Sequence, residues 1–176
     1  QEEQASLLIR ASKDRRLAEQ EVDKLRPKVE REPIAGYLTV HITGNQKQET
    51  RKAKVSVRFV QVQLDPPWRP EGKKLPPVTM HAVLVREDSP PDNVDDPIEW
   101  LLLINLPVDD FEDAVQVIEW YCCRWQIEVY HKVIKSGCRV EDCRLQTADR
   151  LQNFIALMSV IAWRLHWLTY INRAKP

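Results

Sequence analysis

Within the stretch from residue 34 to residue 106, apolar and polar positions alternate in the first two strand-like segments, and this period of two is typical of β-strands. Two further runs, at 78–85 and 100–104, are predicted as strands, and the second is nearly all apolar. A strand of that composition is expected to be buried on both faces. The apolar positions of the first two strands are Tyr37, Val40, Ile42, Val55, Val57 and Phe59. A sheet is therefore predicted in the middle of the chain.

Three segments between these strands predict connections rather than core. Gly44-Asn45 predicts a turn, and the proline-rich run 66–77 predicts a connection. The acidic segment 87–99 contains three prolines and is interpreted as an exposed loop.

The first 31 residues carry weaker signals. The apolar run 7–10 is followed by basic residues and predicts a buried strand that leads into a charged loop. Charged residues dominate 17–31, where Pro27 interrupts the pattern, so this part is predicted to be a short helix or an irregular connector.

Helical signals begin at Asp109. Asp109, Asp110 and Asp113 crowd the start of a predicted helix that runs to about Tyr121, because carboxylates are favoured near the positive end of a helix dipole. These acids are interpreted as helix caps.

Two more helices are predicted after it. One begins near Arg124 and ends at Gly137. The last is started by Thr147 and Asp149 and is expected to pack on a sheet through a broad apolar stripe. That stripe consists of Leu151, Phe154, Ile155, Leu157, Met158, Ile161, Leu165 and Leu168. With strands first and helices last, the predicted fold class is α+β.

Net charge, cysteine spacing and the length of apolar runs limit the kinds of partner and the compartment that this chain can be expected to have. The 26 Lys and Arg residues balance the 26 Asp and Glu residues, so any contact with nucleic acid must be local. Four irregularly spaced cysteines and the lack of a signal-peptide pattern favour a reducing cytoplasm. The longest apolar run, 154–163, is too short to span a bilayer and is followed by Arg164, so no membrane partner is expected.

Candidate chemistry is concentrated in 120–137. On a helix, Arg124, Glu128, Lys132 and Lys135 form one polar stripe with His131 at its edge. An ordinary solvated face with a Glu–Lys pair is the simpler interpretation. A single carboxylate among several cations also suits a metal or phosphate site, and the aromatic residues Tyr121 and Trp125 flank the stripe.

The cysteines offer a rival site. Cys122, Cys123, Cys138 and Cys143, with His131 between them, could supply zinc ligands. No Cys-x2-Cys pair exists and adjacent cysteines on a helix diverge, so incidental thiols are the preferred interpretation.

The spacing Tyr121-x2-Arg124-x3-Glu128-x6-Lys135 resembles the signature of bacterial DDE transposases of the insertion-sequence-four group. The neighbouring Arg-Trp-x-Ile-Glu and His-Lys-x-x-Lys-Ser-Gly resemble the transposon-five type of that group. The resemblance implies metal-dependent phosphodiester hydrolysis and strand transfer by an Asp-Asp-Glu triad with Mg²⁺ or Mn²⁺. It also implies DNA partners (transposon ends and target), a homodimer in the synaptic complex, and a nucleoid-associated protein in the bacterial cytoplasm.

The resemblance further implies a partial ribonuclease-H-like core with an inserted antiparallel β-lobe. Residues 1–33 would hold the last core strand and a connector, 34–108 the inserted lobe, and 109–176 the helical part of the core that carries the signature.

The resemblance assigns roles to single residues. Glu128 would be the catalytic glutamate and a metal ligand. Arg124 and Lys135, together with Tyr121 and Lys132, would grip the phosphate near the cleaved end, and Trp125 would also contact DNA.

Trp100 has two interpretations. On residue type alone it is a buried aromatic that opens an apolar strand. The segment Pro97-x-x-Trp100-Leu-Leu-Leu resembles the family segment whose tryptophan stacks on a base flipped out at the transposon end.

The match lacks both triad aspartates. Residues 1–6 contain none, Asp14 follows the strand and is interpreted as a loop residue, and Glu2 and Glu3 have the wrong length. The chain begins without a methionine and is expected to be a C-terminal-half fragment that is inactive alone. The alternative is a non-catalytic remnant that binds DNA or a protein.

Overall fold

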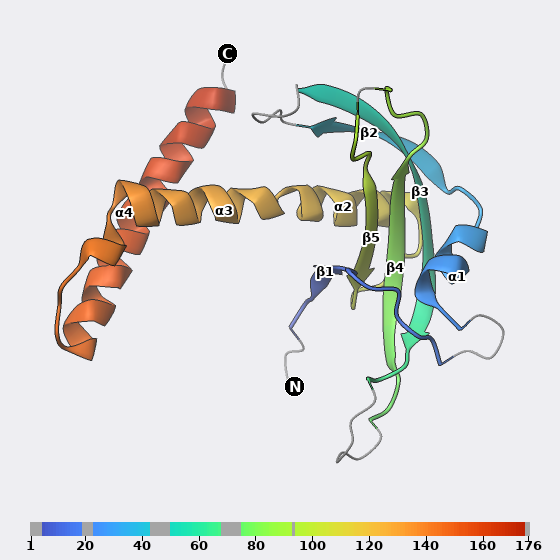
Figure 1. The fold of residues 1–176 in the computed structure, drawn as a ribbon, viewed down its shortest axis with the longest axis horizontal. Helices are drawn as coiled ribbons and strands as arrows, with labels where there is room; N and C mark the ends of the chain where they lie inside the picture. The colour runs from blue at the N-terminus through green and yellow to red at the C-terminus, as the bar shows by residue number, and fades with distance from the viewer. Residues whose placement is uncertain (1–4, 19–22, 43–49, 68–74, 93, 175–176) are drawn as a thin grey trace. The chain divides into compact units, whose positions relative to one another are not determined.

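The computed structural model describes residues 5–18, 23–42, 50–67, 75–92 and 94–174. The chain forms two compact units, 1–119 and 120–176 (Figure 1). The predicted turn at Gly44-Asn45, most of the proline-rich run, and Glu2 and Glu3 lie outside the described residues.

The first unit is built on a sheet of five strands in the order β1-β5-β4-β3-β2, and every neighbouring pair is antiparallel. The strands are β1 (Leu8–Arg10), β2 (Gly36–Ile42), β3 (Arg51–Leu64), β4 (Val78–Glu87) and β5 (Glu99–Ile104). The strands predicted from the alternation are therefore confirmed. The mixed α and β content and the antiparallel sheet agree with the predicted class.

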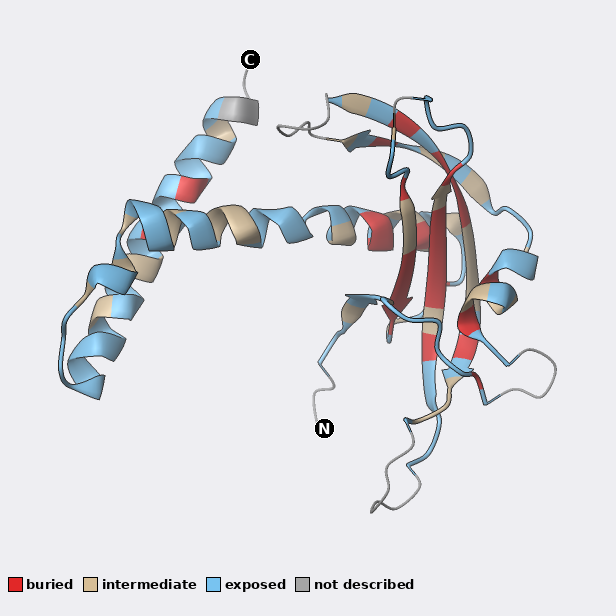
Figure 2. Cartoon of the chain, viewed as in Figure 1, coloured by how far each residue is buried: buried red, intermediate tan, exposed pale blue. Residues whose placement is uncertain are grey.

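The core lies on both faces of the central strands, because consecutive residues of β4 and β5 are buried (Figure 2). On one face, helix α1 (Leu25–Arg31) inserts Leu25 and Val29 against the sheet. The cluster on that face consists of Leu17, Leu25, Val29, Val62, Met80, Ala82, Leu84, Leu101 and Leu103. The prediction that β5 is buried on both faces is confirmed for residues 101–104, which are at most 3 % exposed.

Helix α1 is a short helix, one of the two predicted alternatives for 17–31. Pro27 occupies its first turn, where a missing N–H removes no helical hydrogen bond. The backbone N–H of Arg26 donates to Asp14 Oδ1 over 2.9 Å. Asp14 thus caps α1 from a distant part of the chain, a role that its position in a loop did not predict.

One prediction about burial is wrong. Strand β1 is not a buried strand, since Ile9 is 41 % exposed and Leu7 before it is 48 % exposed. The segment interpreted as an exposed loop is exposed at 88–92 and 95–97, as predicted. Its ends belong to β4 and β5, and Glu87 and Ile98, which directly precedes β5, are buried. The N–H of Glu87 donates to the carbonyl of Ile98, and the N–H of Ile98 donates to the carboxylate of Glu87.

Helix α2 (Phe111–Cys122) begins as the acidic residues predicted. The N–H of Asp113 donates to Asp110 Oδ1 over 2.9 Å, and the N–H of Asp109 donates to Asp113 Oδ2 over 2.9 Å. These bonds satisfy backbone donors that a helix start leaves open. The caps are confirmed.

Gly36 of β2 lies against the Phe111 ring. A Cβ on Gly36 would stand 2.5 Å from Phe111 Cε2, much closer than van der Waals contact. Gly36→Ala is therefore expected to lower the free energy of unfolding by about 1–3 kcal/mol, measured by urea titration. Adding Phe111→Leu to Gly36→Ala should recover part of that loss, and equal stability of Gly36→Ala and the unsubstituted chain would contradict this packing.

The second unit contains α3 (Arg124–Lys132), the π-helix η1 (Val133–Gly137), the 3-10 helix η2 (Val140–Asp142) and α4 (Ala148–Ala174). Helical structure does begin at Arg124 and end at Gly137, as predicted. It is not one regular helix, because the N–H of Cys138 donates to the carbonyl of Val133 over 2.9 Å, a bond five residues long.

Within the second unit, helix α4 contacts α3 and η1. Its packing on a sheet stays a prediction. Among its described side chains only Ala162 and His166 are buried. Residues 148–172 form a helix that is long and apolar enough to cross a membrane by length and composition, although the apolar run 154–163 alone is not. One such helix is weak support for a membrane span.

Candidate functional site

The polar stripe of the second unit starts with an ion pair on α3. Arg124 Nη1 lies 2.5 Å from Glu128 Oε1, one helical turn away, and the side chains are 55 % and 40 % exposed. The hydrogen bond to Glu128 raises the pKa of Arg124, burial opposes this increase, and Tyr121 adds to it. The structure therefore brings Tyr121, Arg124 and Glu128 together, with the carboxylate facing its arginine rather than the interior.

Lys135 lies beyond the regular α-helix that carries Arg124 and Glu128. It lies in η1, and its Nζ is 2.9 Å from Glu141 Oε1, in η2. The wider winding of a π-helix breaks the α-helical spacing that would align Lys135 with Arg124 and Glu128. Glu141 is a residue that the sequence reasoning did not select, and only the fold of 137–142 brings it near.

The remaining predicted residues fall in both units. Lys132 and His131 are exposed at the end of α3, and Trp125 is 61 % exposed on the same helix. Trp100 is half-buried in β5 of the first unit. It is thus neither the fully buried aromatic of one interpretation nor a free surface residue.

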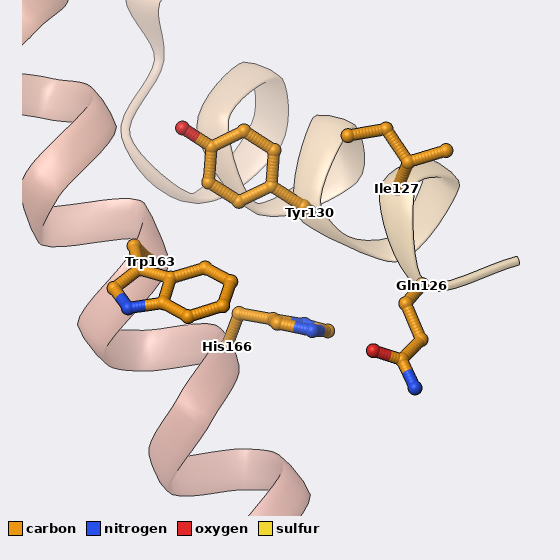
Figure 3. A pocket seen from close by; sticks show the side chains of 5 residues that line it. All are labelled: Gln126, Ile127, Tyr130, Trp163 and His166. Atoms are coloured by element: carbon orange, nitrogen blue, oxygen red, sulfur yellow. The ribbon is translucent and has the colours of Figure 1, made fainter. Parts of the chain in front are cut away.

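An apolar pocket of about 400 Å³ opens between α3 and α4 (Figure 3). Its lining consists of Gln126, Ile127, Tyr130, Trp163 and His166. The Tyr130 hydroxyl donates to the carbonyl of Ser159 over 3.2 Å, which ties α3 to α4. Ile127 and Tyr130 lie one turn apart on α3 and face this pocket, and the sequence gave no signal for His166.

No disulfide joins any two of the four cysteines. Within the described ranges, no three His, Cys, Asp or Glu side chains gather closely enough to hold a metal ion. The carboxylate of Glu128 is bound by the guanidinium of Arg124. The described residues of this chain therefore do not form a complete Mg²⁺ site, which requires several oxygen ligands.

The family model described as the transposase DDE domain matches residues 1–165. The chain belongs to this family. Members of this family are transposases, which act in DNA transposition and DNA recombination. The substrate of the family is DNA. DDE transposases generally use divalent metal ions. The resemblance read from the signature is confirmed at the level of the DDE transposase family.

Proposed function

We propose that the chain supplies the glutamate and the phosphate-binding cations of a cut-and-paste transposase of the insertion-sequence-four group, transposon-five type. The observation that carries this proposal is the partly exposed cluster of Tyr121, Arg124 and Glu128, in which Arg124 and Glu128 form an ion pair, in a chain of the DDE family. The proposed fold is a partial ribonuclease-H-like core with an inserted antiparallel lobe.

The reaction is the attack of a water or a 3′-hydroxyl on a phosphorus that is shielded by negative charge. Arg124 binds a phosphate oxygen pair in bidentate fashion, because a guanidinium offers five N–H donors in a fixed fork. Its ion pair with Glu128 leaves donors for the phosphate and holds the planar group in one orientation. Lys135 adds a point charge, while Lys132, Tyr121 and Trp125 bind DNA more peripherally.

A divalent ion, when bound, would polarise the nucleophile and stabilise the leaving oxygen. Glu128 would give it one carboxylate ligand, and the two aspartates of the triad would come from outside the described residues. The chain alone is therefore proposed to be inactive in cleavage. The enzyme that contains it would act as a homodimer on paired transposon ends in the bacterial nucleoid.

Trp100 is proposed to stack on a base that is flipped out at the transposon end. Its half-buried position supports this role, because a ring that is anchored at its base and open on part of its surface can receive a nucleobase. Stacking on an aromatic side chain offsets part of the cost of unstacking the base.

A second candidate is a module that binds DNA without cleaving it. It is favoured by the exposure of Arg124 and Lys135, which are 55 % and 59 % exposed and accessible to phosphate whether or not a metal is held nearby. Both candidate functions use the same cations to bind DNA. A cleavage assay of the full-length enzyme distinguishes them, because only the transposase cleaves DNA.

Arg124→Ala tests the contact between Arg124 and a DNA phosphate, which both candidate functions require. Removing a charge-assisted contact is expected to weaken binding of a linear duplex about tenfold and to lower the slope of log affinity against log salt by about 1. Fluorescence anisotropy over a salt series measures both quantities. Arg150→Ala, an exposed arginine at the start of α4, is the matched control. If Arg124→Ala and Arg150→Ala bind DNA with equal affinity and equal salt slope, the proposed contact between Arg124 and phosphate is overturned.

A further inference from the structure

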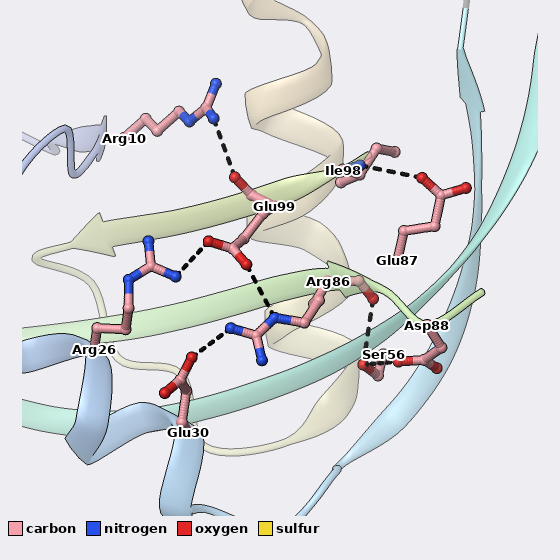
Figure 4. A network of polar contacts seen from close by, with 9 residues as sticks. All are labelled: Arg10, Arg26, Glu30, Ser56, Arg86, Glu87, Asp88, Ile98 and Glu99. Atoms are coloured by element: carbon pink, nitrogen blue, oxygen red, sulfur yellow. Dashed lines mark hydrogen bonds and ion pairs between the residues drawn. The ribbon is translucent and has the colours of Figure 1, made fainter. Parts of the chain in front are cut away.

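Glu99, the residue before Trp100, is bound by three arginines from three different elements (Figure 4). Arg10 Nη2, from β1, donates to the carbonyl oxygen of Glu99 over 3.1 Å. Arg86 Nε, from β4, donates to Glu99 Oε2 over 3.1 Å, and Arg26 of α1 binds Oε1. Both the peptide group that joins Glu99 to Trp100 and the side chain beside it are therefore fixed.

The backbone one residue earlier is held by a second network. The N–H of Ile98 donates to Glu87 Oε2 over 3.1 Å, and the N–H of Glu87 donates to the carbonyl of Ile98 over 2.9 Å. Arg51 in turn binds both carboxylate oxygens of Glu87. Two consecutive residues before Trp100 are thus anchored by side chains as well as by the strand ladder.

The exposure of the Glu99 network argues against a purely structural role. Side chains of Glu99, Arg26 and Arg86 are 41 %, 36 % and 37 % exposed. Ion pairs so open to water contribute little to folding stability, because solvent screens them and long side chains lose entropy when they are held. A polar cavity of about 460 Å³ also opens here, lined in part by Arg10, Arg26 and Glu99.

Successive residues of a strand point to opposite faces, so Glu99 and Trp100 are coupled through one peptide plane. Fixing Glu99 on its face fixes the direction in which the next Cα–Cβ bond leaves on the other face. A ring that is already oriented loses less entropy when a base stacks on it.

We propose that Glu99 is a positioning residue that orients Trp100 for stacking on an extrahelical base, with Arg10, Arg26 and Arg86 holding it in place. This inference rests on the proposed function of Trp100. It adds a residue that makes no contact with DNA itself and acts through the backbone of its neighbour.

The test compares two duplex probes of equal length, one fully paired and one with a single unpaired thymine. The unsubstituted chain is expected to bind the bulged probe about tenfold more tightly, within the range for stacking one base on an aromatic ring. Glu99→Gln should reduce this preference at least threefold and leave affinity for the paired probe unchanged. Asp95→Asn makes the same change of charge in the exposed loop nearby and should leave the preference intact.

Trp100→Ala separates failure of the inference from failure of the proposed function. If the unsubstituted chain binds both probes with equal affinity, or if Trp100→Ala retains the preference for the bulged probe, the stacking role of Trp100 is overturned. The positioning role of Glu99 is then overturned as well. If Trp100→Ala abolishes the preference while Glu99→Gln retains all of it, only the positioning role is overturned.

Folding of each variant is followed by its thermal midpoint. Should Glu99→Gln fail to fold, Arg26→Gln removes one partner of the carboxylate and leaves Arg10 and Arg86. It is expected to lower the preference for the bulged probe in the same direction. If a folded Arg26→Gln chain keeps the full preference for the bulged probe, the proposal that Arg26 holds Glu99 in place to orient Trp100 is contradicted.

Discussion

Glu128→Gln, introduced into a full-length transposase that contains this sequence, is expected to reduce cleavage of end-bearing DNA more than about 100-fold. Even the groups that only support a metal ligand cost 10- to 100-fold in activity when they are lost, so a ligand should cost more. Glutamine keeps the size of the side chain and removes the charge that a divalent ion needs. The measurement is single-turnover cleavage of a labelled duplex in Mg²⁺.

Binding of DNA should behave differently from cleavage in this variant. Arg124 loses the carboxylate that it binds at 2.5 Å, so its charge becomes fully available to phosphate and affinity should be unchanged or higher. Asp142→Asn, an exposed acid of the same unit, is the control and should cleave normally. Normal cleavage by Glu128→Gln would exclude the catalytic role, whatever the affinity for DNA.

Arg51→Met is expected to lower the free energy of unfolding by about 3 kcal/mol at pH 7, because it leaves a buried carboxylate without its partner. The side chain of Glu87 is only 3 % exposed and that of Arg51 17 % exposed, so water replaces the lost partner poorly. Lys52→Met removes the same charge from the exposed face of the same strand and should cost far less. Guanidinium titration measures the difference.

The stability difference between the unsubstituted chain and Arg51→Met is expected to depend on pH. The hydrogen bond from Arg51 lowers the pKa of Glu87, burial opposes it, and the Ile98 N–H adds to the lowering. A carboxyl whose folded pKa is depressed contributes stability above its unfolded pKa of about 4.3 and loses it as pH falls through the folded pKa. The gap between the unsubstituted chain and Arg51→Met should therefore shrink in acid, and a gap that stays constant down to about pH 2 would contradict the pairing.

The strands could be predicted because each has its own local signal, alternation in β2 and β3 and a nearly continuous apolar run in β5. The capped start of α2 could be predicted because its acids are close together in sequence. The Arg51–Glu87 pair could not. It depends on the register that sets Val55 of β3 opposite Glu87 of β4, and no local pattern encodes that register. Asp14 was missed as a cap for the same reason, since its partner Arg26 is 12 residues away.

The candidate site was predicted in part. Fixed spacing on one helix identified Arg124 and Glu128, which are one turn apart and do pair. Lys135 was placed by extending the same α-helical geometry, and the π-helix of 133–137 changes that geometry. The fold of the segment that follows, which brings Glu141 to Lys135, has no signature in the residues near the motif.

The π-helical turn of 133–137 limits what the signature spacing can encode. It is closed by the bond from the N–H of Cys138 to the carbonyl of Val133, and turns of this kind are frequent at functional sites. Because Lys135 lies in this wider turn, counting residues from Glu128 at the α-helical period does not give the direction of its side chain. The ammonium group is instead located by its contact with Glu141, so a relative that conserves the spacing without the π-helical turn would present this lysine in another direction.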